Sequence, residues 1–208
     1  MSDDTSRDAA IRALSDWNIS VKSVEPLTMT ENIVFKVTDQ SGQAYVLRLH
    51  RPGYHTLKEL ISEQRWTAAL LDDGLDVPVP RTTCGGQAYT SINVGDEHRY
   101  VGLLEWVDGV PMQSLIENNP DAGFITESFS LLGGIMAECH NQAVSWTLPE
   151  AFARHSFDAD GLTGEGPFWV RFWESASLTP AQQAYFDKLR RHIHAVLLSL
   201  GKDTPTYS

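Results

Sequence analysis

The order of strand-like and helical segments in the first half of the chain constrains its fold more than any other feature. Three runs with β-branched and aromatic content come first, then an amphipathic segment at 57–71, then two more such runs. The five runs lie at residues 21–27, 32–38, 44–50, 88–94 and 98–107. Turn residues at 39–42 and 95–96 separate neighbouring runs, as expected of hairpins. This order predicts an α+β lobe, with a five-stranded antiparallel sheet and one helix on a face.

The pattern changes after residue 109 and predicts a second part of the chain. Apolar residues now recur at helical spacing, apart from an irregular, aromatic-rich stretch at 150–180. In this part, helical patterns lie at residues 111–118, 125–141 and 180–200; a further short helical pattern, at 8–17, precedes the first strand. We therefore predict a first lobe at 1–104, a connector at 105–109 and a partial, mainly helical lobe at 110–208.

Composition excludes several classes of protein. The 208 residues carry a formal net charge of −11, which argues against nucleic-acid binding because phosphate backbones require a basic surface. The same charge fits either a cationic substrate or simple solubility. No run approaches the ~20 apolar residues of a membrane span, and the acidic N-terminus is not a secretory signal. Cys84 and Cys139 lack metal-ligand spacing, so we expect free thiols in a reducing compartment. Together these observations predict a cytoplasmic protein without nucleic-acid or membrane partners.

Arg48 is the first candidate for chemistry. Strand alternation puts it on the face opposite Leu47 and Leu49. A charge in an otherwise apolar strand needs a partner, unless it is simply exposed on an edge strand. The following helix offers Glu63, with Glu59 as the second choice; a solvated glutamate is the alternative. A strand cation paired with a helix glutamate is the arrangement that positions the α- and β-phosphates of ATP in kinases.

The connector is the second candidate. An adenine ring needs one hydrogen-bond acceptor and one donor at a fixed spacing, and extended backbone supplies both. The carbonyl of Glu105 and the amide of Val107, on either side of Trp106, have this spacing. The alternative is an ordinary linker between two lobes.

Six segments of the chain together resemble the aminoglycoside phosphotransferase and choline kinase-like family, whose fold is protein-kinase-like. They are residues 45–52 (YVLRLHRP), 63–66 (EQRW), 74–80 (GLDVPVP), 104–109 (LEWVDG), 132–140 (LGGIMAECH) and 157–173 (FDADGLTGEGPFWVRFW). The last segment is similar to bacterial homoserine- and hydroxylysine-kinase-like members. Each motif is weak alone, but their order and spacing are specific, and the resemblance extends over nearly the whole chain.

The resemblance implies roles for individual residues. Arg48 would bind phosphates and Glu63 would hold Arg48. The connector, with Glu105, Trp106 and Val107, would hold adenine through backbone atoms. Asn32 and Phe35 would sit in the loop over the nucleotide. That loop, residues 28–32, contains no glycine, so cradling of phosphates by its backbone is not expected.

The catalytic motifs of this family are missing from the chain. The family's loop reads His-x-Asp-x-x-x-x-Asn, and neither it nor the later metal-binding Asp is found. His140 and the pair His192 and His194 lack Asp and Asn in register. Asp158 and Asp160 lack further ligands for a metal, so a plain turn is expected there. In relatives the catalytic loop follows a stretch like 200–208, so we expect a truncated kinase.

The leading hypothesis is therefore a fragment of an ATP-dependent phosphotransferase that acts on a hydroxyl of a small metabolite or aminoglycoside-like acceptor. ATP and Mg²⁺ would be cofactors of the complete enzyme, and this chain alone is expected to be inactive. Two alternatives remain open: a non-catalytic nucleotide-binding module, and an interaction domain. Expected partners are an adenine nucleotide, a small hydroxylated substrate and a second copy of the chain, held through apolar surface exposed by truncation.

Overall fold

The computed structural model describes residues 3–119 and 121–201. The chain forms two compact units, Met1–Phe152 and Ala153–Ser208. The connector predicted at 105–109 lies inside the first unit, so the lobe boundary there stays a prediction. Within the described ranges, no helix combines the length and apolar character needed to cross a bilayer.

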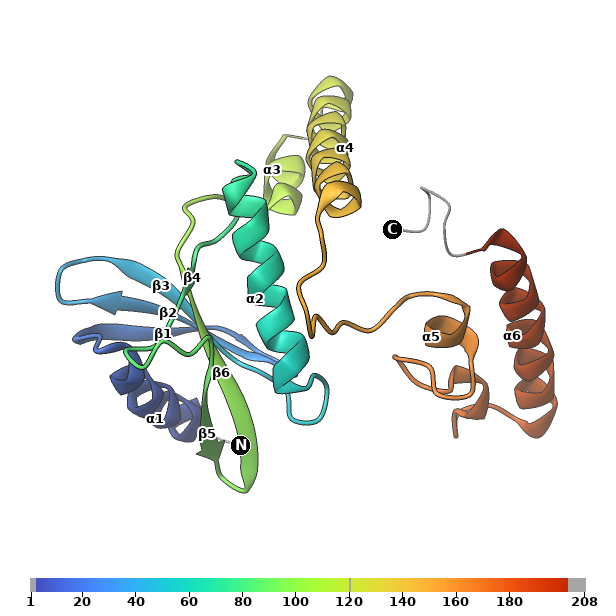
Figure 1. Ribbon diagram of the computed structural model, residues 1–208, viewed down its shortest axis with the longest axis horizontal. Coiled ribbons are helices and arrows are strands. Elements are labelled where there is room, and N and C mark those ends of the chain that lie inside the picture. The colour runs from blue at the N-terminus through green and yellow to red at the C-terminus, as the bar shows by residue number, and fades with distance from the viewer. Residues whose placement is uncertain (1–2, 120, 202–208) are drawn as a thin grey trace. The chain divides into compact units, whose positions relative to one another are not determined.

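The first unit is built on a mixed α/β arrangement with an antiparallel sheet (Figure 1). Its strands are β1 (Val21–Met29), β2 (Ile33–Asp39), β3 (Ala44–Leu49), β4 (Pro80–Arg81), β5 (Thr90–Val94) and β6 (Glu97–Glu105). The sheet order is β1-β2-β3-β6-β4, and β5 pairs with β6. The five expected strands are present. The sixth, β4, was missed because two residues carry no pattern. Its residues Pro80 and Arg81 pair with Leu104 and Leu103 of β6, and the proline ring favours an extended backbone there.

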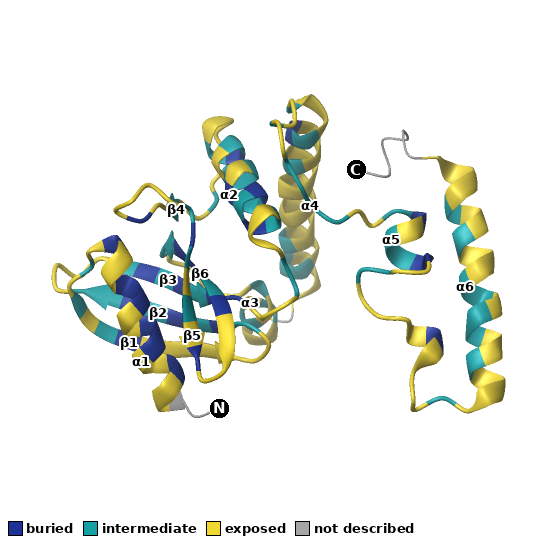
Figure 2. Cartoon of the chain, turned by 60° about the horizontal axis from the view of Figure 1, so that its bottom comes forward, coloured by how far each residue is buried: buried dark blue, intermediate teal, exposed yellow. Residues whose placement is uncertain are grey.

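One face of the sheet is closed by the N-terminal helix. Helix α1 (Asp3–Ala13) and the 3₁₀ turn η1 (Leu14–Trp17) bury an apolar side against the strands (Figure 2). In β3 the alternate residues Tyr45, Leu47 and Leu49 enter this core, as strand alternation predicts. The intervening residues, Arg48 among them, therefore point to the opposite face of the sheet.

Helix α2 (Leu57–Asp72) has a well-defined start. The Thr56 side chain accepts from the Glu59 amide at 3.3 Å, and the Glu59 carboxylate accepts from the Thr56 amide at 2.8 Å. This reciprocal capping box uses Glu59, the second choice as a partner for Arg48. Further along α2, the indole of Trp66 donates to Gln142 Oε1 at 3.0 Å and ties the helix to α4.

Two helices follow the connector in the first unit, α3 (Met112–Asn118) and α4 (Ala122–Ser145). The Asp121 carboxylate accepts from the Phe124 amide at 3.0 Å and caps α4. The apolar side chains of α4 are largely exposed. Those above one third exposure are Phe129, Leu131, Leu132, Ile135, Met136 and Val144.

The second unit contains α5 (Ala159–Thr163), the 3₁₀ turn η2 (Phe172–Glu174) and α6 (Pro180–Leu200). As predicted, Thr179 caps α6 and Pro180 is its first residue. The region expected to be irregular contains α5, which begins at the capping residue Asp158, so the expected plain turn is a helix start.

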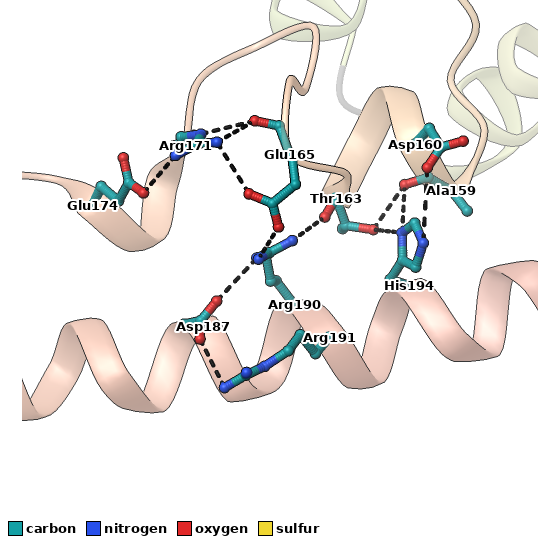
Figure 3. Close-up of polar contacts among 10 residues, drawn as sticks. All are labelled: Ala159, Asp160, Thr163, Glu165, Arg171, Glu174, Asp187, Arg190, Arg191 and His194. Carbon is teal, nitrogen blue, oxygen red and sulfur yellow. Dashed lines mark hydrogen bonds and ion pairs between the residues drawn. The ribbon is translucent and has the colours of Figure 1, made fainter.

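A polar network joins α5 and η2 to α6 (Figure 3). Arg190 donates to the Thr163 carbonyl at 2.9 Å and to Glu165 at 2.7 Å, while its guanidinium lies 4.3 Å from the ring centre of the buried Trp173. His194 Nε2 lies 3.8 Å from Asp160. The charged side chains of this network therefore have their partners within the second unit.

Candidate nucleotide-binding site

Arg48 and Glu63 meet on the sheet face opposite the α1 core. The guanidinium Nη1 lies 4.0 Å from Glu63 Oε1, and the two side chains are 39% and 35% exposed. The edge-strand alternative for Arg48 is wrong, because β3 lies between β2 and β6, but the side chain is partly exposed. At this distance and exposure the pair stabilises the fold only weakly, so the cation stays available to an anion.

A cavity of about 210 Å³ adjoins the ion pair. Arg48, Glu63 and His50 line it together with Tyr89 and Gly102. Gly102 pairs with Arg48 across the β3–β6 ladder, and an added Cβ there would lie 2.6 Å from Cε1 of Tyr89. The absence of a side chain at Gly102 therefore lets the Tyr89 ring lie against the sheet.

The second basic side chain that lines this cavity is His50. His50 is buried, and its ring contacts Tyr89 edge-on with 5.4 Å between ring centres. Burial, and then the charges of Arg48 and His55, lower the pKa of His50 from 6.5 to about 3. The imidazole is therefore neutral at physiological pH.

The connector is extended and fixed by backbone bonds. The Glu105 amide donates to the Val79 carbonyl at 2.9 Å, and the Trp106 amide donates to the Ala44 carbonyl at 3.1 Å. Val107 is 52% exposed. The carbonyl of Glu105 and the amide of Val107 thus stand at the end of β6, next to the strand that carries Arg48.

Lys36 lies beside the connector and was not identified from the sequence as a residue of the site. Its Nζ is 4.1 Å from the ring centre of Trp106, whose indole donates to Asp108 at 2.9 Å. Lys36 pairs with Val46 of β3 and therefore shares the face of Arg48. Alternation along β2 was the available signal, because Phe35 and Lys36 must point to opposite faces.

Asn32 and Phe35 have different environments from each other. Asn32 lies in the β1–β2 loop as expected, and its Oδ1 accepts from the Arg51 amide at 3.0 Å. The placement of Phe35 in that loop was wrong: it lies in β2 and is 1% exposed. Its ring belongs to the core on the α1 side, because a large apolar side chain gains most from burial there. We therefore leave Phe35 out of the site.

Comparisons with known proteins give the family of the chain. Residues 23–205 match the phosphotransferase enzyme family. The chain belongs to this family. The match includes residues of both units of the chain. No curated protein sequence matches the chain.

Solved structures similar to this chain include two kinases of small molecules. A microcompartment-associated aminopropanol kinase is 27% identical, with a TM-score of 0.76, and the similarity covers 96% of this chain and 59% of the kinase. The amicoumacin kinase hAmiN, solved in complex with AMP-PNP, Ca²⁺ and Ami, is 16% identical with a TM-score of 0.69, covering 92% and 53%. The predicted kinase-like fold is confirmed. The chain spans between 53% and 59% of the length of these two proteins.

Proposed function

We propose that this chain is the nucleotide-binding part of a small-molecule kinase, which transfers the γ-phosphate of ATP to a hydroxyl group. The observation that carries the proposal is the ion pair between Arg48, on the inner strand β3, and Glu63, on helix α2, at 4.0 Å. The extended connector, fixed by backbone hydrogen bonds, lies at the end of the neighbouring strand β6. A half-exposed cation held by a carboxylate suits the α- and β-phosphates, because positioning and charge neutralisation supply most of the catalysis in phosphoryl transfer.

The proposed roles follow from position. Arg48 binds phosphate oxygens, and Glu63 limits the orientations open to its guanidinium. The Glu105 carbonyl and the Val107 amide bond the adenine edge, with Trp106 between them. Asn32 lies in the loop over the phosphates; its Oδ1 is already bonded to the Arg51 amide, so we assign it to shaping that loop.

A divalent metal is part of the proposed reaction but not of the site described above. Mg²⁺ neutralises the phosphates in this reaction class. The sequence offers no His-x-Asp-x-x-x-x-Asn loop and no later metal-binding Asp, so we assign no metal ligand or base to these residues. We therefore expect negligible turnover from the 208-residue chain alone, and Mg²⁺-dependent phosphorylation by it would contradict this expectation.

The proposed acceptor is a small hydroxylated amine. The aminopropanol kinase is named for such a compound, and the structure of the amicoumacin kinase includes Ami. A net charge of −11 supports a cationic acceptor by long-range attraction. The two cysteines are free thiols, which supports the predicted cytoplasmic location.

Titration calorimetry with ATP tests the nucleotide site. We expect binding by the wild-type chain and a loss of about 10- to 100-fold in Arg48→Ala, because bonds to charged groups contribute about 1.5–3 kcal/mol. Arg12→Ala, which removes an exposed arginine from α1, is the matched control and should bind ATP like the wild type. Absence of ATP binding by the wild type, or equal affinity in Arg48→Ala, would refute the proposal. An interaction domain predicts no nucleotide binding at all.

A further inference from the structure

Arg99 of β6 is a buried charge outside the site described above. Its side chain is 6% exposed. A buried guanidinium destabilises a fold unless its donors are bonded, so its partners indicate what it organises. Those partners lie on three different segments of the first unit.

One nitrogen of Arg99 joins the β1–β2 loop to the end of β3. Nη1 donates to the Glu31 carbonyl at 3.2 Å and to the His50 carbonyl at 3.4 Å. Nε and Nη2 donate to Glu97 Oε2 at 3.0 and 2.7 Å, which fixes the plane of the guanidinium. A planar side chain with five donors suits this role, whereas lysine has a single, flexible ammonium.

The two carbonyls belong to the two halves of the proposed phosphate site. Glu31 is in the loop over the nucleotide, next to Asn32. His50 follows Arg48 by two residues, and its amide donates to the Tyr100 carbonyl at 2.8 Å. Arg99 therefore bridges the loop and the end of the Arg48 strand, in addition to the pairing of Ile33 with Leu49 between β2 and β3.

Other contacts at this loop are weaker candidates for the same task. Arg51 lies 2.6 Å from Glu31, but the two side chains are 45% and 63% exposed. Exposed ion pairs contribute little to stability. Asn32 Oδ1 also accepts from the Arg51 amide at 3.0 Å, but this contact is exposed as well. The contacts of Arg99 to the two carbonyls are buried or part-buried and therefore hold the loop more firmly.

We propose that Arg99 is a positioning residue for ATP: it holds the β1–β2 loop and the Arg48 strand at the separation that the phosphates require. The inference rests on the proposed function, since it assigns Arg99 to the same nucleotide site. It predicts that losing Arg99 weakens binding of the triphosphate while sparing the adenine end at the connector.

Calorimetry of Arg99→Gln with ATP and with adenosine tests this inference. We expect ATP to bind about 5- to 10-fold more weakly, because one or two hydrogen bonds that position the loop are lost. Adenosine affinity should change less than about twofold. Arg7→Gln is the matched control, because Arg7 also donates to a backbone carbonyl, that of Val24 at 3.2 Å, but from α1. It should bind both ligands like the wild type.

The outcomes separate this inference from the proposed function. If the wild type binds no ATP, the proposed function fails. If the wild type binds ATP and folded Arg99→Gln binds it equally well, or loses ATP and adenosine affinity to the same extent, only the role of Arg99 fails. Should Arg99→Gln not fold, Glu97→Gln replaces it, because Glu97 is half-exposed and only holds the guanidinium. A two- to threefold loss for ATP alone supports the role, and unchanged ATP affinity overturns it.

Discussion

The ammonium of Lys36 lies 4.1 Å from the ring centre of Trp106, and so joins the second strand of the sheet to the connector. Both residues lie on the Arg48 side of the sheet, where the nucleotide is proposed to bind. A cation over an indole at a partly exposed site is worth about 0.5–1 kcal/mol. The contact therefore gives the connector a side-chain restraint in addition to its backbone bonds.

A double-mutant cycle measures the Lys36–Trp106 contact. Lys36→Met and Trp106→Leu should each lower the free energy of unfolding, and the double variant should lose less than their sum by about 0.5–1 kcal/mol. Urea unfolding followed by far-UV circular dichroism is the measurement. The same cycle with Lys22→Met, an exposed lysine of β1, should show additive effects.

Glu63→Gln should affect binding more than stability. Because the pair is 4.0 Å apart and partly exposed, we expect a change in the free energy of unfolding of less than about 1 kcal/mol. ATP affinity should fall several-fold, since Arg48 loses the carboxylate that restricts its orientation. Urea unfolding and calorimetry on the same preparations provide both values. Loss of several kcal/mol of stability without weaker ATP binding would show that Glu63 is purely structural.

His50 predicts a specific dependence of stability on pH. Its pKa is lowered from 6.5 to about 3, chiefly by burial, so between these values the unfolded chain binds a proton that the folded chain does not. The stability that neutral His50 contributes is complete above about pH 6.5 and declines toward pH 3, by up to about 1.4 kcal/mol per unit.

Urea unfolding of the wild type and His50→Gln between pH 4 and pH 7 tests this dependence. Below about pH 6 the free energy of unfolding should fall more steeply in the wild type than in His50→Gln. The exposed His192 offers a control, and His192→Gln should keep the slope of the wild type. Parallel slopes for the wild type and His50→Gln would contradict the burial argument.

Two glycine substitutions should have opposite effects. Gly102→Ala places a methyl group 2.6 Å from the Tyr89 ring, and overpacking of this kind typically costs about 1–3 kcal/mol. Gly133→Ala in α4 meets no described atom within 4 Å, and should stabilise the helix by about 1 kcal/mol. Thermal unfolding of the two variants gives the signs directly. A stabilised Gly102→Ala would mean that the Tyr89 ring moves away freely.

The exposed apolar side chains of α4 predict self-association at high concentration. Ile135 is 56% exposed within this group, and an apolar surface of this kind favours association. Sedimentation velocity should show a larger species that Ile135→Glu reduces. Val170 is 70% exposed in the second unit, and Val170→Glu is the control that should leave association unchanged. A monomeric wild type at the highest concentration would contradict this prediction.

Several features of the site follow from local patterns. The period of two along β3 separates Arg48 from Leu47 and Leu49, and the structure has them on opposite faces. Outside the site, the start of α6 was also predicted from a local pattern, because Thr179 is a capping residue and Pro180 suits the first helical position. Glu63 was chosen over Glu59 as the partner of Arg48 from its place at the margin of the apolar stripe of the helix, and the structure has Arg48 and Glu63 4.0 Å apart.

The sequence by itself determined most elements of this protein, their order and the alternation of faces, because backbone geometry and capping act over a few residues; it did not indicate β4 or α5. Only the tertiary structure decided what covers each face. Phe35 packs into the core that α1 covers, and Lys36 of β2 contacts Trp106 of the connector. The β5–β6 hairpin brings Arg99 within hydrogen-bond distance of the Glu31 carbonyl in the β1–β2 loop. These contacts join residues far apart in the chain, and their energies depend on burial and distance, which no local pattern contains.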